Sequence, residues 1–200
     1  MSDLATKRSP APPPLDLVEA FINTLDLETG ADELATTSAL RGWLLGRHLI
    51  KRAEAVSERD RQQAIRLREA LRRAALANNS TAVDSRTMRE LNQLAHGARM
   101  VVAFGDDGAA RLDPSVKGVA GGLARILSGV FVAMLTGGWT RLKSCANNGC
   151  HWAFYDASKN RSGRWCEMAD CGNEAKGRAY RARRRSKVDA RSGLGATGRK

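Results

Sequence analysis

The sequence lacks an apolar run long enough to cross a membrane and a leader typical of exported proteins. Its longest unbroken apolar run, 130–135, is far shorter than the roughly 20 residues that a membrane-spanning helix needs. The first sixteen residues contain neither the apolar segment nor the small-residue cleavage site of a signal peptide. We therefore expect a cytoplasmic protein with no membrane partner.

Cysteine and, towards the C-terminus, negative charge are also scarce. Only four cysteines occur, and because thiols stay reduced in the cytoplasm, metal ligation is favoured over disulfides. Residues 141–200 hold 15 lysines and arginines against 5 acidic residues, so most of the net charge of +12 lies there. Charge gathered in one module is typical of a module that binds a polyanion.

The chain begins with a proline-rich leader followed by helical patterns. The prolines make residues 1–14 an extended, disordered leader. Apolar residues over 15–25 fit a short helix, although a strand stays open there. Thr36 or Thr37 can cap the next helix.

Two further helices have clear start signals. Ser57 and Asp60 form a capping-box pattern, and the apolar residues that follow recur at spacings of three and four. This pattern predicts an amphipathic helix over 58–77. Ser85 can cap another helix that carries apolar residues at the same spacing up to Ala98.

The pattern then changes from helix to hairpin and back. Residues 100–114 contain two apolar runs around a Gly-Asp-Asp-Gly turn, which predicts a β-hairpin. Residues 118–136 are almost entirely apolar, with Arg125 as the one charge, and predict a buried central helix whose glycines permit close packing. The expected segments are a leader (1–14), a helical domain (15–140), a basic module (141–188) and a disordered basic tail (189–200).

All four cysteines lie in the basic module, in two equally spaced pairs. Their pattern is C-x4-C, fifteen intervening residues, then C-x4-C, formed by Cys145, Cys150, Cys166 and Cys171. Two close pairs separated by a short insert suit one tetrahedral zinc ion, and four thiolates leave no open position, so the zinc is expected to be structural. The alternatives are reduced thiols, two disulfides, or an iron–sulfur cluster, which usually has tighter spacings.

The segments around the cysteines predict a treble-clef-like order of knuckle, hairpin and helix. The insert 151–165 reads as a hairpin between the two pairs, and the following helix carries the last ligands in its first turn. On that helix Ala175, Ala179, Ala182 and Ser186 fall on one stripe that can pack on the hairpin, with basic rows on either side. We therefore expect an α+β chain: a mainly helical N-terminal domain with a small β-hairpin, then this zinc finger.

The same residues carry a family resemblance. The run from Trp152 to Ser162, the segment Arg164–Met168, and Cys171-Gly172-Asn173 followed by Lys176 resemble the CGNR-type zinc finger. Residues 15–44 are similar to the start of the ABATE domain that precedes such fingers in bacterial proteins. The resemblance implies a stress-related transcription regulator whose finger binds DNA and whose N-terminal domain is sensory.

Two positions depart from the resemblance. Relatives usually carry arginine at the position of Glu174 and commonly at that of Gly163. A helix N-terminus favours an acidic residue, so the fold tolerates Glu174, but a phosphate contact by arginine is lost there.

The leading hypothesis is a zinc-stabilised regulator that binds double-stranded DNA. Each basic side chain taken alone fits a solvated surface charge, and it is their clustering that indicates a polyanion. The candidate contacts are Lys159, Arg161 and Arg164 in the insert, and Lys176, Arg178, Arg181, Arg183, Arg184, Arg185 and Lys187 on the helix. The N-terminal domain is expected to sense a small ligand or to form a homodimer that presents two fingers.

Two other classes of function compete with this hypothesis. Trp152, Phe154 and Tyr155 could form a stacking platform for RNA, or for binding to the ribosome, although packing around zinc is the simpler role. Treble-clef nucleases need a second metal held by histidine or acidic residues on the helix, where this chain has alanine and arginine. We therefore expect no catalytic site.

Overall fold

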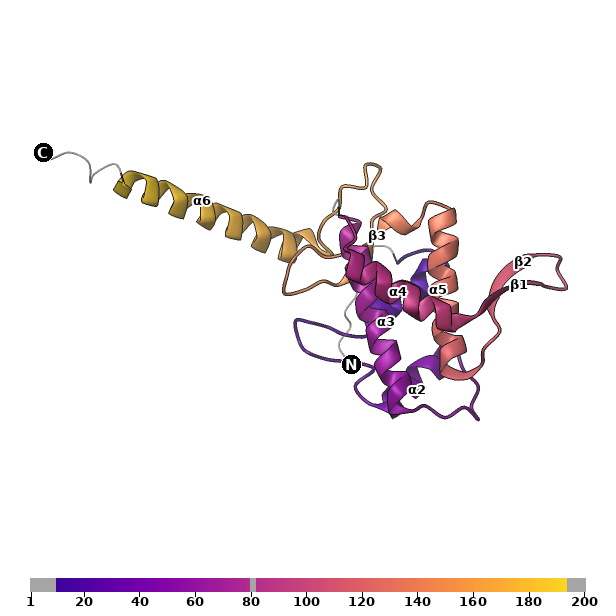
Figure 1. The fold of residues 1–200 in the computed structure, drawn as a ribbon. Helices are drawn as coiled ribbons and strands as arrows, with labels where there is room; N and C mark the ends of the chain where they lie inside the picture. The colour runs from indigo at the N-terminus through magenta and orange to yellow at the C-terminus, as the bar shows by residue number, and fades with distance from the viewer. Residues whose placement is uncertain (1–9, 80–81, 194–200) are drawn as a thin grey trace, which may run out of the picture.

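The computed structural model describes residues 10–79 and 82–193, and consists of a helical body from which a hairpin and one long helix project (Figure 1). The elements in chain order are α1 (Leu15–Ile22), α2 (Thr37–Gly46), α3 (Glu58–Ala77), α4 (Ser85–Ala98), β1 (Met100–Phe104), β2 (Ala110–Pro114), α5 (Gly118–Leu135), η1 (Trp139–Arg141), β3 (Leu142–Ser144), β4 (Ala153–Tyr155), η2 (Met168–Gly172) and α6 (Asn173–Gly193).

Both predicted disordered ends are partly structured. Residues 1–9 and 194–200 lie outside the described residues. Ala11, however, is buried and donates its backbone N–H to Glu19 at 2.8 Å, so the packed chain starts within the predicted leader. At the other end the helical backbone of α6 continues to Gly193, beyond the predicted start of the tail.

Local capping decides where several helices begin. The hydroxyl of Thr36 accepts a hydrogen bond from the first turn of α2, and Ser57 and Asp60 form both bonds of the capping box of α3. Asp84 caps α4 by accepting from the N–H of Thr87 at 2.9 Å, so the predicted cap at Ser85 is one residue late. A carboxylate and a hydroxyl can both cap a helix, and the sequence offered both side by side.

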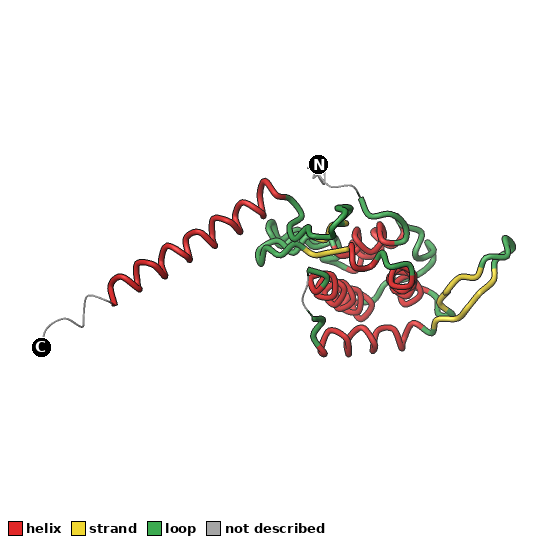
Figure 2. Tube along the Cα trace, turned by 90° about the horizontal axis from the view of Figure 1, so that it is seen from above, coloured by secondary structure: helices red, strands yellow, loops and turns green. Residues whose placement is uncertain are grey.

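The core lies between α1, α3 and α5, with α4 packed across α3 and α5 (Figures 1 and 2). The glycines of α5 allow close approach: a Cβ atom at Gly122 would lie 3.1 Å from the carbonyl oxygen of Leu49. Leu142 of β3 and Ala153 of β4 belong to the same buried cluster as the helices. The finger's first strands are therefore part of the core of the N-terminal domain.

Helix α5 is only partly buried, although the sequence predicts a buried helix. Val119, Ile126 and Ala133 lie in the core, whereas Phe131 and Leu135 are exposed. By length and composition alone α5 could cross a membrane, a property that core helices share, and half of this segment is buried in the described chain. The sequence shows only short unbroken apolar runs here because glycines interrupt them, but glycines do not make the helix polar.

The β1–β2 hairpin is confirmed and projects from the body beside α5 (Figure 1). Val102 pairs with Leu112, and the two strands turn at residues 105–109. Val102 and Phe104 are exposed at 65% and 77% of their surfaces, so the hairpin presents apolar side chains to solvent.

Candidate metal centre and nucleic-acid interface

The four cysteines converge in the structure. Cys145 follows β3, Cys150 ends the next turn, Cys166 precedes η2, and Cys171 lies within η2. Their sulfurs all lie within 4.8 Å of one another. Cys166 is half-buried and the other three are buried. The structure therefore brings together all four predicted metal ligands.

The spacing of the sulfurs fits one zinc ion. Zinc with Zn–S distances of about 2.3 Å in a tetrahedron places its sulfurs about 3.8 Å apart. The sulfurs of Cys150 and Cys166 are 3.6 Å apart, and those of Cys166 and Cys171 are 3.8 Å apart. Trp152 and Trp165 pack around the cluster and limit access of water. The four cysteines form a site for one structural zinc.

Four thiols at this spacing share their protons. Hydrogen bonds from the thiols of Cys150 and Cys166 lower the pKa of Cys145, whereas bonding to Cys145 raises the pKa of Cys150. The neighbouring thiols thus favour a thiolate at Cys145, and repulsion between like charges opposes ionisation of Cys150. Because a dication offsets that repulsion, zinc binding is coupled to release of protons from the cysteines.

Backbone hydrogen bonds shape the turn from Cys145 to Cys150. The N–H of Cys150 donates to the carbonyl of Asn147 at 2.9 Å, and the N–H of Cys145 donates to the carbonyl of Trp152 at 2.9 Å. The chain leaves the turn at His151, whose φ is +49°. Its Nδ1 lies 3.0 Å from the carbonyl oxygen of Cys145, which can only accept, so Nδ1 carries the hydrogen. His151 thus supports the turn.

The second pair of cysteines is held differently from the prediction. Cys171 lies in the π-helical turn η2 ahead of α6, and Cys166 lies in the loop before it, so neither is in the first turn of α6. Gly172 leaves room for Met168, since a Cβ at Gly172 would lie 2.4 Å from the Met168 sulfur. The side chain of Asn173 donates to a carbonyl one turn earlier at 2.7 Å. In the Cys-Gly-Asn run, the cysteine is a metal ligand, the glycine leaves space for the Met168 side chain, and the asparagine binds a carbonyl within η2.

The predicted hairpin between the two cysteine pairs is wrong. Strand β4 pairs with β3, which precedes Cys145, so the hairpin encloses the first pair of cysteines. The rest of the insert, 156–165, forms a loop in the described structure. Strand β3 could not be predicted from the sequence because it is only three residues long and its central residue, Lys143, is charged.

A buried ion pair holds this loop. Lys143 Nζ lies 2.9 Å from Asp156 Oδ2 and also donates to the carbonyls of Arg161 and Gly163 at 2.5 and 2.9 Å. Burial alone would raise the pKa of Asp156, but hydrogen bonds from Ser158, Lys143 and two backbone amides outweigh it and lower that pKa to about 2. Lys143 therefore fastens the loop to β3, and its buried charge does not contribute to the basic surface.

Side chains of the N-terminal domain fasten the finger in place, and no sequence pattern predicted these contacts. Asn78 donates to the carbonyls of Trp139 and Leu142 at 2.9 and 2.8 Å, and Asn79 donates to Ser144 at 2.6 Å. The buried guanidinium of Arg72 donates to the carbonyl of His151 at 3.1 Å. Asparagines directly after a helix usually indicate its end, so only the fold reveals that they reach the finger.

The predicted nucleic-acid contacts in the insert lie on the loop. Lys159, Arg161 and Arg164 are exposed. The guanidinium of Arg161 donates to Thr140 at 3.0 Å, and that of Arg164 lies 5.9 Å from the centre of the Trp165 ring. Both contacts leave other donors of each guanidinium facing solvent.

The predicted contacts on the helix lie on α6, which extends away from the body (Figures 1 and 2). The alanine stripe does not pack on the hairpin: Ala182 is exposed and Ala175 only half-buried, while the side chains at 179 and 186 lie outside the described ones. Packing is prevented because α6 leaves η2 pointing outward. The exposed cations are Lys176, Arg178, Arg181, Arg183 and Arg184; Arg185 and Lys187 lie on the same helix with side chains outside the described ones.

The three aromatic residues of the insert face inward. Phe154 is 2% exposed, Tyr155 packs against the main core, and Trp152 packs against the cysteines. They therefore serve in packing, the simpler of the two roles considered, and do not form an exposed stacking platform for RNA.

Two family models match the chain. The ABATE model, described as "Putative stress-induced transcription regulator", matches residues 12–138, and the CGNR zinc finger model matches residues 141–184. Both agree with the resemblance seen in the sequence. No curated protein matches the chain.

Proposed function

The chain belongs to the ABATE family, and we propose that it is a zinc-dependent bacterial transcription regulator that binds double-stranded DNA through α6. A cytoplasmic location follows from that role. A treble-clef-like form of the finger is part of the proposal: β3 and β4 enclose the turn that carries Cys145 and Cys150, and α6 follows the second pair of cysteines.

The projecting α6 is the observation that carries the proposal. Among its described side chains five cations are exposed, and the acidic Glu174 lies at its base. A helix of 21 residues is about 30 Å long and fits the major groove of DNA. Arginines on several sides of such a helix can reach phosphates on both walls of the groove and guanine edges at its floor.

The N-terminal domain is proposed as the sensor. Helices α3, α4 and α5 enclose a cavity of about 130 Å³ with Arg66, Gln63 and Gln93 among its lining residues and Leu123 and Leu127 along α5. This volume is below the roughly 300–1,000 Å³ of ordinary ligand pockets, so the proposed ligand has only a few heavy atoms, with a polar and an apolar end. Its occupancy would alter the packing of α3, which also carries Arg72 under the finger.

A homodimer is part of the proposal, because one small finger offers a limited contact area. The exposed apolar side chains of the β1–β2 hairpin offer a surface for the second copy. The hairpin and α6 project from opposite sides (Figure 2), so a dimer joined there would present its two α6 helices to separate DNA segments. Sedimentation of the zinc-loaded protein with and without DNA tests this.

No enzymatic activity is proposed. Four thiolates complete a tetrahedral zinc shell, so the metal offers no open position to a substrate.

Selection from random duplex DNA by the zinc-loaded protein tests the proposed function. About six to eight phosphate contacts would give a slope of log K against log salt near −5 to −7. Replacing Arg181, Arg183 and Arg184 by alanine should weaken binding and make that slope shallower by about 2 to 3. The matched control replaces three exposed arginines of the N-terminal domain, Arg59, Arg86 and Arg125, and should leave the slope unchanged. Absence of enriched sequences would exclude a sequence-specific regulator.

A further inference from the structure

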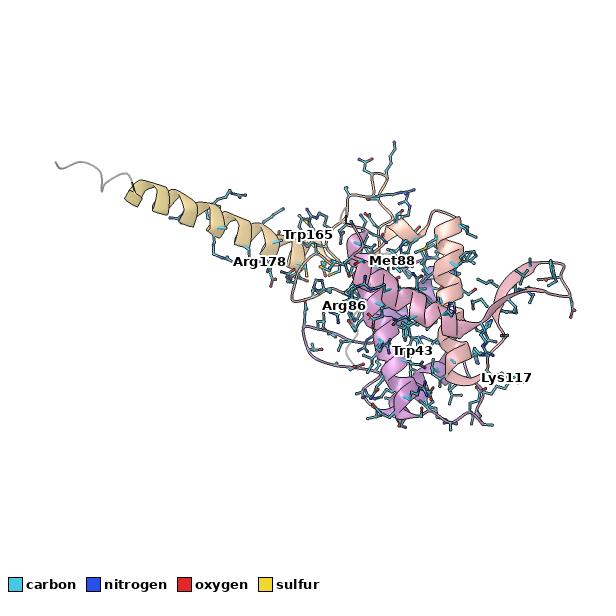
Figure 3. All side chains as sticks on the ribbon, in the orientation of Figure 1. Trp43, Arg86, Met88, Lys117, Trp165 and Arg178 are labelled. Atoms are coloured by element: carbon cyan, nitrogen blue, oxygen red, sulfur yellow. The ribbon has the colours of Figure 1, made fainter. Side chains whose placement is uncertain are left out.

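Asn147 links the metal centre to the first turn of α6. It lies in the turn between Cys145 and Cys150 and is 5% exposed. Its Nδ2 lies 3.4 Å from the sulfur of Cys171 and 2.9 Å from Glu174 Oε2. Its Oδ1 accepts from the guanidinium of Arg178 at 3.0 Å. One buried side chain thus contacts a zinc ligand and two successive turns of the helix; Figure 3 shows Arg178 at the base of α6.

The chemistry of the amide matches these partners. An asparagine amide has two N–H donors and one carbonyl acceptor. The two donors face a thiolate and a carboxylate, both acceptors, and the carbonyl faces a guanidinium, which can only donate. The backbone carbonyl of Asn147 also accepts from the N–H groups of Cys150 and His151, so the residue is fixed at both ends.

Among the described residues, α6 has few other contacts that set its direction. It packs against η2, and in the described chain it projects away from the other helices and strands (Figures 1 and 2). An isolated helix in water is only marginally stable, so contacts at its N-terminal end decide both its order and its orientation.

We propose that Asn147 is a positioning residue that fixes the direction of α6 relative to the zinc centre, with Glu174 as its partner on the helix. An arginine at position 174 would offer no acceptor for the N–H of Asn147 and would face it with another donor. Glu174 therefore gives the first turn of α6 an acceptor that a basic residue could not supply. The claim that this fixed direction assists DNA binding rests on the proposed function. The claim that Asn147 fixes the direction of α6 does not.

Residual dipolar couplings of backbone amides in the zinc-loaded full chain test the proposal. In the wild type the couplings of α6 should fit the same alignment as those of α3. In Asn147→Ala they should shrink toward zero while those of α3 stay unchanged. Asn148→Ala, which changes the exposed neighbouring asparagine, is the matched control. Glu174→Gln keeps an acceptor and should behave as the wild type, whereas Glu174→Arg should behave as Asn147→Ala.

DNA affinity supplies a second readout. Asn147→Ala should weaken binding about tenfold without changing the salt slope, because the cations remain and only their prior ordering is lost. Unchanged couplings in α6 of Asn147→Ala overturn the proposal. If Asn147→Ala does not bind one zinc per chain, the test passes to zinc-loaded Glu174→Arg. Unchanged couplings of α6 in that variant then overturn the proposal. Failure of the wild type to bind DNA overturns the proposed function instead. The residual dipolar couplings then still test whether Asn147 fixes the direction of α6.

Discussion

Asn23 pairs with Ala153 as a neighbouring β-strand would. Its side chain donates to the carbonyl of Ala153 at 2.9 Å and accepts from the N–H of Ala153 at 2.7 Å, across 130 residues of sequence. The backbone of Ala153 faces away from β3, because the adjacent Trp152 carbonyl is the one that bonds across to Cys145. One amide side chain at the end of α1 therefore covers the free edge of β4 and joins the finger to the N-terminal domain.

Replacing Asn23 by alanine should lower the free energy of unfolding by about 2 to 4 kcal/mol, because the N–H and carbonyl of the buried Ala153 lose their partners. Urea denaturation with saturating zinc measures this loss. Asn160→Ala, at an exposed asparagine of the finger, should change stability by less than about 0.5 kcal/mol. Equal effects of the two substitutions would show that the contact with Ala153 contributes little.

Removing zinc should unfold the segments that carry the cysteines, together with α6, while β3, β4 and the helices of the N-terminal domain stay folded. Structural zinc contributes about 10–16 kcal/mol in small fingers, and α6 leaves the body directly from the metal site. A chelator should shift the emission of Trp152 and Trp165 to longer wavelength, since both pack around the cysteines. Circular dichroism should report loss of the helical content of α6, and one equivalent of zinc should restore both signals. Unchanged spectra after complete zinc removal would contradict a structural role.

The ion pair of Lys143 and Asp156 should be sensitive to loss of one partner. Asp156→Asn should destabilise the protein by about 3 kcal/mol, because the buried ammonium of Lys143 loses its counter-charge. The double variant Lys143→Met, Asp156→Asn should recover part of this, because no charge remains buried. The exposed pair of Arg111 and Asp107 is the control, and Asp107→Asn should cost less than about 1 kcal/mol. Similar costs for the two asparagine substitutions would contradict the importance of burial.

Acid should leave the ion pair intact until low pH. The pKa of Asp156 is about 2 in the folded chain, below its ordinary value of 3.8. The carboxylate therefore contributes about 2 kcal/mol at pH values above roughly 4, and this contribution is lost as the pH falls through about 2. Carbon-13 NMR of the carboxyl group measures the titration directly. A midpoint near 4 would contradict the hydrogen-bonded arrangement.

Gly163 should resist substitution. A Cβ atom at Gly163 would lie 2.9 Å from both Cγ and Oδ2 of Asp156, whose carboxylate is fixed by its hydrogen bonds. Gly163→Ala should therefore destabilise the zinc-loaded protein by about 1 to 3 kcal/mol. Gly149→Ala is a control in the same finger, because a Cβ there meets no atom within 4 Å. Equal urea midpoints for the two variants would mean that Asp156 moves freely.

The sequence by itself determined the features that depend on neighbouring residues or on strict spacing. The cap at Ser57, and a cap at Thr36 or Thr37, were predictable because a helix start is a local hydrogen-bonding pattern; the structure places the second of these caps at Thr36. The zinc ligands were predictable because all four cysteines fall into two equally spaced pairs, a pattern that favours a tetrahedral metal site.

Only the tertiary structure decided how the finger is attached and where α6 points. The contacts of Asn23, Asn79 and Asn147 join residues far apart in the chain, and polar side chains of this kind carry no periodic signal. Lys143 looked like part of the basic surface until the fold placed it beside Asp156. A pattern of spacings determines which face of a helix is apolar, but what packs against that face is set by the packing of the whole chain.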